Sequence, residues 1–410
     1  MLDIDTPDVH SPHVRSAGKG LLSLALLDSR NRTLRWLAIY EEALGAQHFA
    51  VPHWPELDPP LWVFGHIGWF HERWLARNVH RQRGTQADAS APRLASIEPD
   101  ADRWYDPAMA SHGARWQLDL PGAQQVRRYL ADTMDIVLEL LDSAGENDEA
   151  LYFFRLALVR EDMFADTLAE MAQCLEVKLG DERALLAEMN TAVPREPLLF
   201  PAARWPLGSA PGGFVFDNEK WAHEVDVPEF EIDAQPVTWA QYSEFVQDGG
   251  YDQAAWWSQA GLAWLERQPR RVPRNVEHMR HGVLVRRFGQ PTRLPVAQPV
   301  AHVSWHEAQA WCRWAGRRLP TEVEWEAAAQ SYSRGFAWGS VWEWTASSFV
   351  PYPGFHPDPW AEYSQPFFGT HKVLRGASVA TRARLRSTKF RRFASPARDH
   401  LFAGFRSCAN

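Results

Sequence analysis

The stretch PVAHVSWHEAQAWCRWAGRRLPTEVEWEAAA, residues 299–329, holds the local signals that decide the fold of the second half of the chain. Apolar residues recur three and four positions apart over residues 304–315, which predicts a helix. Pro320 then ends an extended segment, Thr321 can cap a second helix, and Glu324 three residues later can complete a capping box. We therefore interpret this second segment as a helix start and not as a site.

A buried strand is predicted in VWEWTAS, residues 341–347. Successive side chains of a strand point to opposite faces, so Trp342 and Trp344 share one face while Glu343 lies on the other. Glu343 is expected to accept hydrogen bonds inside the domain. Arg406, in AGFR, is expected to donate to a structural ion pair.

Proline, glycine and tryptophan dominate the chain from about Pro194 onward, and most of its 21 tryptophans lie beyond residue 200. Short apolar runs replace helical periods there, and a further helix is expected near residues 239–246. We predict a loop-rich mixed domain over residues 206–410, preceded by a linker at 191–205. The tryptophans would form either an irregular aromatic core or a cation-binding pocket.

The first half reads as helical, with apolar residues three and four apart and no convincing alternating strands. Residues 1–19 read as a flexible tail, and residues 20–190 as a four-helix bundle with one long crossover at 80–120. The fold class is therefore α+β. The four expected helices cover about 21–44, a segment that starts after the Pro59-Pro60 pair and ends near 79, 122–141 and 148–179.

Composition excludes several classes of protein. A formal net charge of -8 gives no electrostatic footprint for nucleic acid, and no apolar run approaches the roughly 20 residues of a membrane-spanning helix. Arginine is dense between residues 375 and 406, which we interpret as a pocket wall or an ion-pair network. Cys174, Cys312 and Cys408 are widely spaced and odd in number, which fits reduced thiols and a cytoplasmic location.

The order of motifs resembles a known family. The stretch 299–329, with GSVWEWTASSFVPYPGF (339–355), HKVLRGAS (371–378) and LFAGFRSC (401–408), is similar to the domain shared by formylglycine-generating enzyme and the ergothioneine-type sulfoxide synthases. That resemblance implies a sulfatase-modifying-factor-like, C-type-lectin-like fold. LDPPLWVFGHIGWFHERWLARN (57–78) resembles the DinB-like (damage-inducible) bundle that precedes this domain in the synthases. The stretches DPPLWVFGHIGWF, RWQLDLP (115–121) and YFFRLALVREDM (152–163) resemble the selenoneine-synthase branch.

The synthases hold a non-haem Fe(II) by three histidines, one on the second helix and two, four residues apart, on the fourth. His66 matches the first ligand, whereas the other two positions are Arg160 and Phe164. Arginine offers no lone pair and phenylalanine no ligand atom, so the resemblance implies an incomplete iron site. We hypothesise that Arg160 replaces the metal and pairs with Asp166 or Glu161, while Phe164 fills the remaining space. Alternatively, Arg160 reaches solvent and His66 is a core histidine, or His66 and one of the acids form a reduced site.

The resemblance also implies a pocket for the trimethylammonium group of hercynine, a cation that aromatic faces bind well. Arg392 and Phe393 fall on family positions that supply an asparagine and an aromatic ring, and Met163 replaces a polar contact. Arg392 would repel the cation unless an acid pairs with it. Arg115 resembles the arginine that meets the anionic co-substrate, or else forms a surface ion pair. Tyr352 is the candidate catalytic tyrosine, with packing in a turn as the alternative.

Three functions remain open from the sequence. The first is an O2-dependent oxidoreductase that joins a thiol or selenosugar to the imidazole of hercynine. The formylglycine-generating reaction is excluded, because it needs a cysteine pair and the corresponding residues 385–399 contain none. The second is a non-catalytic paralogue that binds a ligand or partner. The third is an altered enzyme with new metal ligands and a new substrate.

Overall fold

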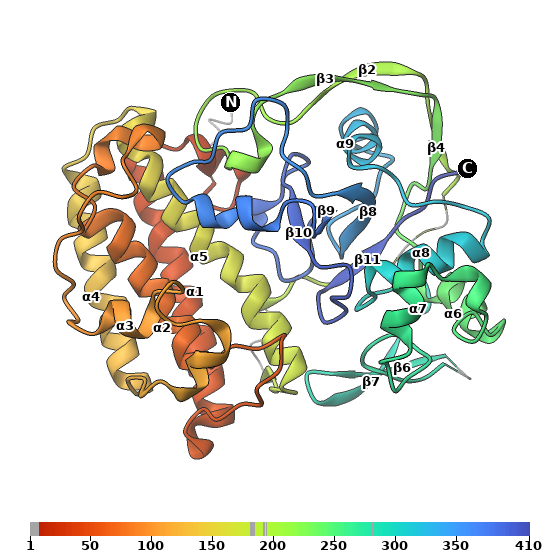
Figure 1. Cartoon of the computed structure of the whole chain (residues 1–410), viewed down its shortest axis with the longest axis horizontal. Coiled ribbons are helices and arrows are strands. Elements are labelled where there is room, and N and C mark those ends of the chain that lie inside the picture. Colours follow the sequence, from red (N-terminus) through yellow and green to blue (C-terminus); the bar gives the residue numbers. More distant parts are fainter. Residues whose placement is uncertain (1–7, 181–184, 192, 194, 280–281) are drawn as a thin grey trace, which may run out of the picture.

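The computed structural model describes residues 8–180, 185–191, 193, 195–279 and 282–410, and it confirms the α+β class. The N-terminal half consists of helices, whereas the C-terminal half combines the strands with helices α6 to α9, and α5 lies between the two halves (Figure 1). The helices of the first half are α1 (Lys19–Leu44), α2 (Pro60–His71), α3 (Ala101–Tyr105), α4 (Ala123–Asp142) and α5 (Asp148–Cys174).

The four long helices start close to their expected positions. Helix α2 begins at Pro60, where a proline needs no backbone N–H, and the Asn147 side chain caps α5 by accepting from the Ala150 N–H at 2.8 Å. Two helices end earlier than expected. Helix α2 gives way to a wider turn over Glu72–Ala76, and α5 ends before Glu176, whose φ of 55° is left-handed.

The second half is built around a four-stranded sheet with the order β10-β9-β8-β11, in which only the β8–β11 pair is parallel. Its strands are β8 (Trp342–Ser348), β9 (Lys372–Gly376), β10 (Arg392–Ala394) and β11 (Ala403–Phe405). The outer strands are β1 (Leu198–Phe200), β2 (Ala203–Leu207), β3 (His223–Val227), β4 (Phe230–Ile232), β5 (Val276–His278), β6 (Val283–Arg287) and β7 (Gln290–Leu294).

Four helices accompany these strands: α6 (Trp239–Gln247), α7 (Gln259–Leu265), α8 (Trp305–Trp314) and α9 (Glu322–Ser331). The capping box expected at Thr321 is present, because its hydroxyl accepts from the Glu324 N–H while the Glu324 carboxylate accepts from the Thr321 N–H at 2.7 Å. The short helix α7 was not expected from the sequence.

Two expected connections differ from the structure. The expected linker at 191–205 contains β1 and the first three residues of β2, and these strands pair with β4 and β3. Within the expected tail, residues 8–18 are placed and bind the second domain: Arg15 pairs with Glu219 at 2.7 Å. Residues 1–7 lie outside the described part of the chain. Among the described helices, none combines the length and apolar character needed to cross a bilayer.

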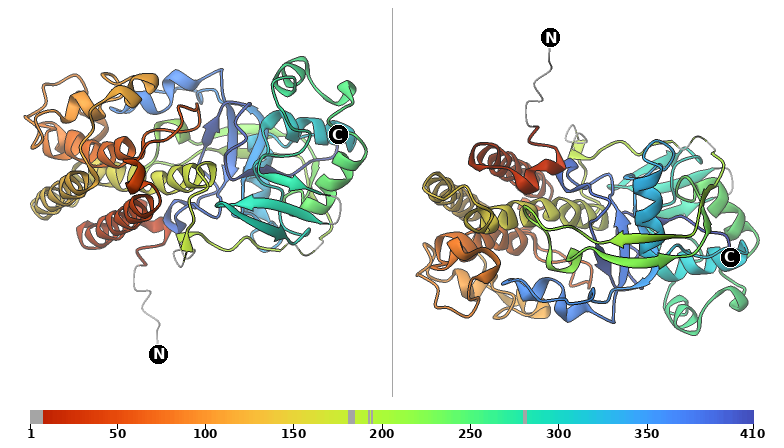
Figure 2. Two further views of the ribbon diagram at one scale, coloured as in Figure 1. Left: turned by 90° about the horizontal axis from the view of Figure 1, so that it is seen from below. Right: turned by 90° about the horizontal axis from the view of Figure 1, so that it is seen from above.

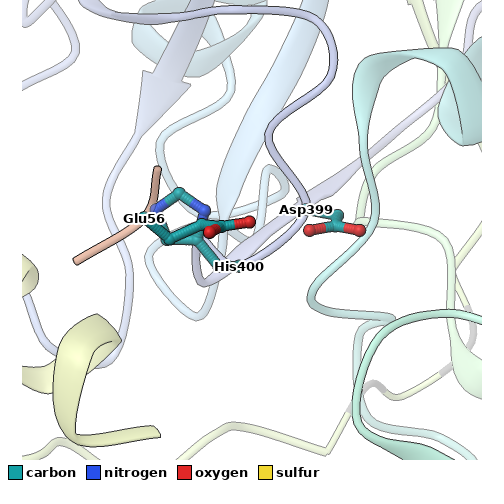
Figure 3. Close-up of side chains that lie close together, drawn as sticks. All are labelled: Glu56, Asp399 and His400. Carbon is teal, nitrogen blue, oxygen red and sulfur yellow. The ribbon is translucent and has the colours of Figure 1, made fainter. Parts of the chain in front are cut away.

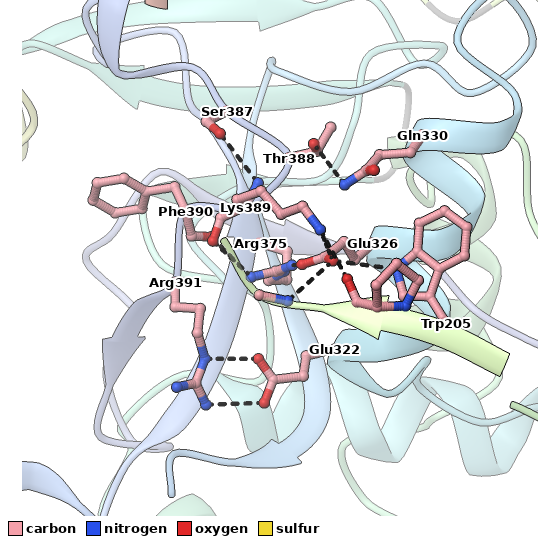
Figure 4. A network of polar contacts seen from close by, with 12 residues as sticks. Trp205, Glu322, Glu326, Gln330, Arg375, Ser387, Thr388, Lys389, Phe390 and Arg391 are labelled. Atoms are coloured by element: carbon pink, nitrogen blue, oxygen red, sulfur yellow. Dashed lines mark hydrogen bonds and ion pairs between the residues drawn. The ribbon is translucent and has the colours of Figure 1, made fainter. Parts of the chain in front are cut away.

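Buried ion pairs hold the sheet domain together (Figure 4). The Glu326 carboxylate accepts from Lys389 Nζ at 2.6 Å and also binds the Arg375 guanidinium, while Glu322 and Arg391 form two parallel bonds of 2.8 and 2.9 Å. The predicted roles of Glu343 and Arg406 are confirmed. Glu343 accepts from the Trp325 indole at 2.9 Å and from Arg406. The dense arginines of this region are therefore largely structural.

Helix α5 joins the two halves, and Figure 2 shows it running from the bundle into the sheet domain. At the far end of α5 the Gln173 side chain accepts from the Phe288 N–H at 3.0 Å and donates to the Arg286 carbonyl at 2.9 Å. Because α5 belongs to the bundle and also contacts the sheet domain, its side chains can line a site between the two.

Candidate functional site

A cavity of about 440 Å³ lies between the bundle and the sheet domain. Its walls come from α2, α5, β10 and the segment that precedes β9, and aromatic rings form much of them. The residues that carry the argument below are His66, Phe70, Arg73, Asp106, Arg160, Met163, Asp166, Trp342, Trp360, Glu362, Tyr363, Arg392 and Phe393.

His66 lies buried on α2 at the edge of this cavity. Its Nδ1 is 2.9 Å from the Tyr105 carbonyl oxygen, which can only accept, so the proton is on Nδ1 and the lone pair is on Nε2. The imidazole stacks on Trp62, with ring centroids 4.8 Å apart. Burial, together with the nearby Arg160 cation, lowers the pKa of His66 to about 3. His66 is therefore neutral at physiological pH.

Arg160 and Phe164 occupy the positions on α5 that face His66. The Phe164 ring meets the imidazole edge-on at 5.8 Å, and the Arg160 guanidinium carbon lies 4.1 Å from the centre of that same ring. Trp360 and Phe70 supply further faces to the guanidinium, at 5.1 and 5.9 Å. Burial lowers the pKa of Arg160 to about 10, so it remains a cation at neutral pH.

These residues do not fit a three-histidine iron centre. Of the three family positions only His66 offers a ligand atom, and a benzyl ring and a guanidinium occupy the space opposite it. Within the described residues, no group of three His, Cys, Asp or Glu side chains around His66 is close enough to share a metal ion. The reduced site considered above, with Glu161 or Asp166, is not assembled.

The prediction that Arg160 forms an ion pair with Glu161 is wrong. Glu161 turns toward α1, where Arg30 binds its carboxylate at 2.9 and 3.1 Å, and His71 Nε2 is 2.9 Å away. Burial opposes ionisation of Glu161, but Arg30 and His71 outweigh it and lower its pKa. Adjacent residues on a helix point about 100° apart, which explains why the Glu161 carboxylate turns away from the Arg160 guanidinium.

Asp166, the other expected partner of Arg160, is also committed elsewhere. Its carboxylate accepts from the Trp342 indole at 3.0 Å and from Ser378 Oγ at 2.7 Å, and Arg392 lies 3.5 Å away. Among the described residues, no carboxylate lies within 4.0 Å of the Arg160 guanidinium nitrogens. The prediction that Arg160 pairs with Asp166 is therefore wrong as well.

Three of the expected substrate-binding residues line the cavity: Met163, Arg392 and Phe393. Arg392 binds the Glu170 carboxylate at 2.9 and 3.0 Å, so the acid that would neutralise it is present. Phe393 stacks on Phe349 with ring centroids 4.0 Å apart and presents an aromatic surface to the cavity. Their roles toward a substrate stay predictions.

Arg115 and Tyr352 do not line the cavity. Arg115 pairs with Asp58 at 2.7 Å and lies over the Trp62 ring, with its guanidinium carbon 3.7 Å from the ring centre. The Tyr352 hydroxyl donates to Glu322 at 3.2 Å, away from His66. These contacts favour the ion-pair interpretation of Arg115 and the packing interpretation of Tyr352 over roles at the reacting centre.

Sequence reasoning missed the segment between β8 and β9, which supplies Trp360, Glu362 and Tyr363 to the cavity. Tyr363 is buried and stacks on Trp360 at 4.8 Å, and Glu362 is exposed beside them. The available signal was the aromatic pair itself, since this segment has neither helical nor strand periodicity.

A second cluster brings together Glu56, Asp399 and His400, whose possible ligand atoms lie within 4.8 Å of one another (Figure 3). Arg274 already bridges the two carboxylates, at 3.2 Å from Glu56 and 2.9 Å from Asp399, and Arg270 binds Asp399 as well. Two guanidiniums thus neutralise the acids. We interpret this cluster as an ion-pair contact between the halves and not as a metal site.

Comparisons with known proteins agree with this architecture. The DinB superfamily model matches residues 25–172, and the model of the sulfatase-modifying factor enzyme 1-like domain matches residues 196–340. Hercynine oxygenase of Mycolicibacterium thermoresistibile is 33% identical, and the alignment covers 94% of each chain. That of Mycolicibacterium smegmatis is 32% identical over 92% of this chain and 96% of its own, and that of Mycobacterium tuberculosis is 32% identical over 94% and 97%. With both domains matched and nearly the whole length aligned, the chain belongs to the hercynine oxygenase family, that of the ergothioneine-type sulfoxide synthases.

Proposed function

We propose that this chain binds a hercynine-like betaine in the cavity between its two halves and does not form the C–S or C–Se bond that the family resemblance implies. The observation that carries this proposal is the pair Arg160 and Phe164 facing His66, in place of two imidazoles. The iron cofactor expected by resemblance has one suitable ligand here instead of three.

The cavity walls support a zwitterionic ligand. Aromatic rings such as Phe393 and Tyr363 line it, and quaternary ammonium groups bind to such faces. Arg392 alone would repel that ammonium group, but the Glu170 carboxylate binds the Arg392 guanidinium at 2.9 Å and offsets its charge. The exposed Glu362 adds a negative charge to the lining. The cavity thus offers both apolar surface and charges of each sign, as small-molecule sites commonly do.

A second candidate keeps the reaction of the family, in which a thiol or selenosugar is joined to hercynine with Fe(II) as cofactor. One observation favours it: His66 lines the cavity, is neutral and retains a lone pair on Nε2. Residues other than those of the family would have to complete the metal shell. The cytoplasmic location and the lack of a nucleic-acid partner stay predictions.

The two candidates differ in metal content and turnover. Purified full-length protein is loaded with Fe(II) and desalted, and bound iron is measured by mass spectrometry. Hercynine affinity is measured by calorimetry. Oxygen consumption is measured in the presence of hercynine and either cysteine or a selenosugar. We expect hercynine binding with far less than one iron per chain and no oxygen consumption. Stoichiometric iron with turnover would establish the second candidate, and absence of hercynine binding would refute the first.

The variant Arg160→His/Phe164→His serves as the matched control. It restores the imidazoles at both positions on α5, four residues apart on one helix face opposite His66. We expect it to retain iron under the same loading conditions. If the double variant takes up iron and wild type does not, the Arg160 and Phe164 side chains, and not the cavity as a whole, exclude the metal.

A further inference from the structure

We propose that Arg160 is the receptor for the ligand's carboxylate, so that a fixed guanidinium takes an anion where the family places an iron ion. This inference rests on the proposed function and adds the ligand's orientation. A small betaine or amino acid would enter with its carboxylate toward α5 and its cationic end toward the aromatic wall.

The guanidinium of Arg160 is held in place without being neutralised. Phe164, Trp360 and Phe70 surround it at 4.1–5.9 Å, and its buried Nε has no hydrogen-bond partner among the described residues. Aromatic faces offset only part of the cost of burying a cation, and no carboxylate among the described residues supplies the rest. An incoming carboxylate would therefore gain a strong, charge-assisted partner.

Arg160 differs from the other two arginines of the cavity. Arg392 is bound by Glu170 at 2.9 Å, and Arg73 lies 3.4 Å from Asp106. Among the described residues that line the cavity, Arg160 alone is an arginine without an ion pair. The guanidinium presents up to five donors in a planar fork, and this geometry matches the two oxygens of a carboxylate.

The surroundings of Arg160 also favour the orientation in which the ligand's carboxylate, and not its ammonium group, lies beside the guanidinium. A trimethylammonium group beside Arg160 would meet a like charge in a low-dielectric place. Among the described residues, no arginine or lysine lies over the Phe393 ring, since Arg391 and Arg392 lie over Phe349 and Trp342 instead. In the proposed orientation the carboxylate meets Arg160 and the cationic end meets the Phe393 ring.

The test compares hercynine with its analogue in which hydrogen replaces the carboxylate. Both ligands are titrated calorimetrically into the full chain, into Arg160→Lys and Arg160→Met, and into Arg204→Gln, which removes an exposed arginine of β2 as a charge-matched control. A charge-assisted pair should make wild type prefer hercynine by about 10- to 100-fold. The preference should persist in Arg204→Gln, weaken in Arg160→Lys and vanish in Arg160→Met.

Equal binding of both ligands to wild type would overturn the inference and leave the proposed betaine site intact. If neither ligand binds, the proposed function fails, and acetate then tests Arg160 separately. In protein with ¹⁵N-labelled arginine, acetate should shift the Arg160 Nε–H resonance, assigned by its loss in Arg160→Lys. A saturable shift supports an anion receptor, and an unmoved resonance overturns it.

Discussion

The core of the sheet domain and the wall of the cavity bury arginine in different ways. In the core, three guanidiniums without exposed surface each bind a glutamate, forming the pairs Arg375–Glu326, Arg391–Glu322 and Arg406–Glu343. In the cavity wall, Arg160 meets aromatic rings and no described carboxylate. An arginine that is already paired with a glutamate belongs to the fold, because binding a ligand would leave its buried glutamate without a counter-charge. An arginine without a carboxylate partner can bind an anionic ligand at no such cost.

The largest effect that tests this comparison comes from Arg406→Met. The substitution leaves the fully buried Glu343 with the Trp325 indole as its remaining donor among the described contacts. Breaking a buried pair from one side should lower the free energy of unfolding by about 3–5 kcal/mol, measured by urea denaturation at pH 7. The double variant Arg406→Met/Glu343→Gln should recover part of that loss, because no charge is left unpaired. A single variant as stable as wild type would show that the pair does not hold the core.

A smaller effect tests the charge of the cavity wall through pH. His66 has a folded-state pKa of about 3, below its unfolded value of 6.5, so the native state binds fewer protons than the unfolded state between these values. Its contribution to stability is complete above pH 6.5 and is lost as the pH falls, by up to about 1.4 kcal/mol per pH unit. Wild type should therefore lose stability faster than His66→Gln between pH 6.5 and 5, in urea titrations at each pH.

Arg160→Met sharpens this test, because the Arg160 cation is the second cause of the low His66 pKa after burial. Removing that cation should raise the imidazole pKa, followed by NMR titration of the ring protons. The coupling between Arg160 and His66 would be contradicted by either of two results. One is an equal dependence of the unfolding free energy on pH in wild type and His66→Gln, and the other is an unchanged His66 pKa in Arg160→Met.

Local sequence signals predicted much of the fold. Proline at position 60 and the capping residues Thr321 and Glu324 act within one helical turn, so their effect could be deduced without tertiary contacts. The strands β1 and β2 were not expected, because the pairing that forms them comes from β4 and β3, further along the chain. Their own residues alternate only weakly.

The site was predicted less completely than the fold. Motif positions placed Met163, Arg392 and Phe393 in the cavity lining, although their roles are untested. The partner of Arg160 was mistaken, because Glu161 lies close in sequence but points to another helix. Trp360 comes from a loop whose position depends on the packing of two domains, and no periodicity marks it.

The smallest expected effect is that of Arg160→Met on folding. Arg160 makes no ion pair with a described residue, so its loss strands no buried charge, and methionine can fill the space between Phe164 and Trp360. The free energy of unfolding should change by less than about 1 kcal/mol in either direction, close to the effect of Arg204→Gln at an exposed ion pair. Urea denaturation of the three proteins, wild type included, measures this directly. A loss of several kcal/mol, like that expected for Arg406→Met, would place Arg160 among the structural arginines, and the distinction between the two regions would then no longer hold.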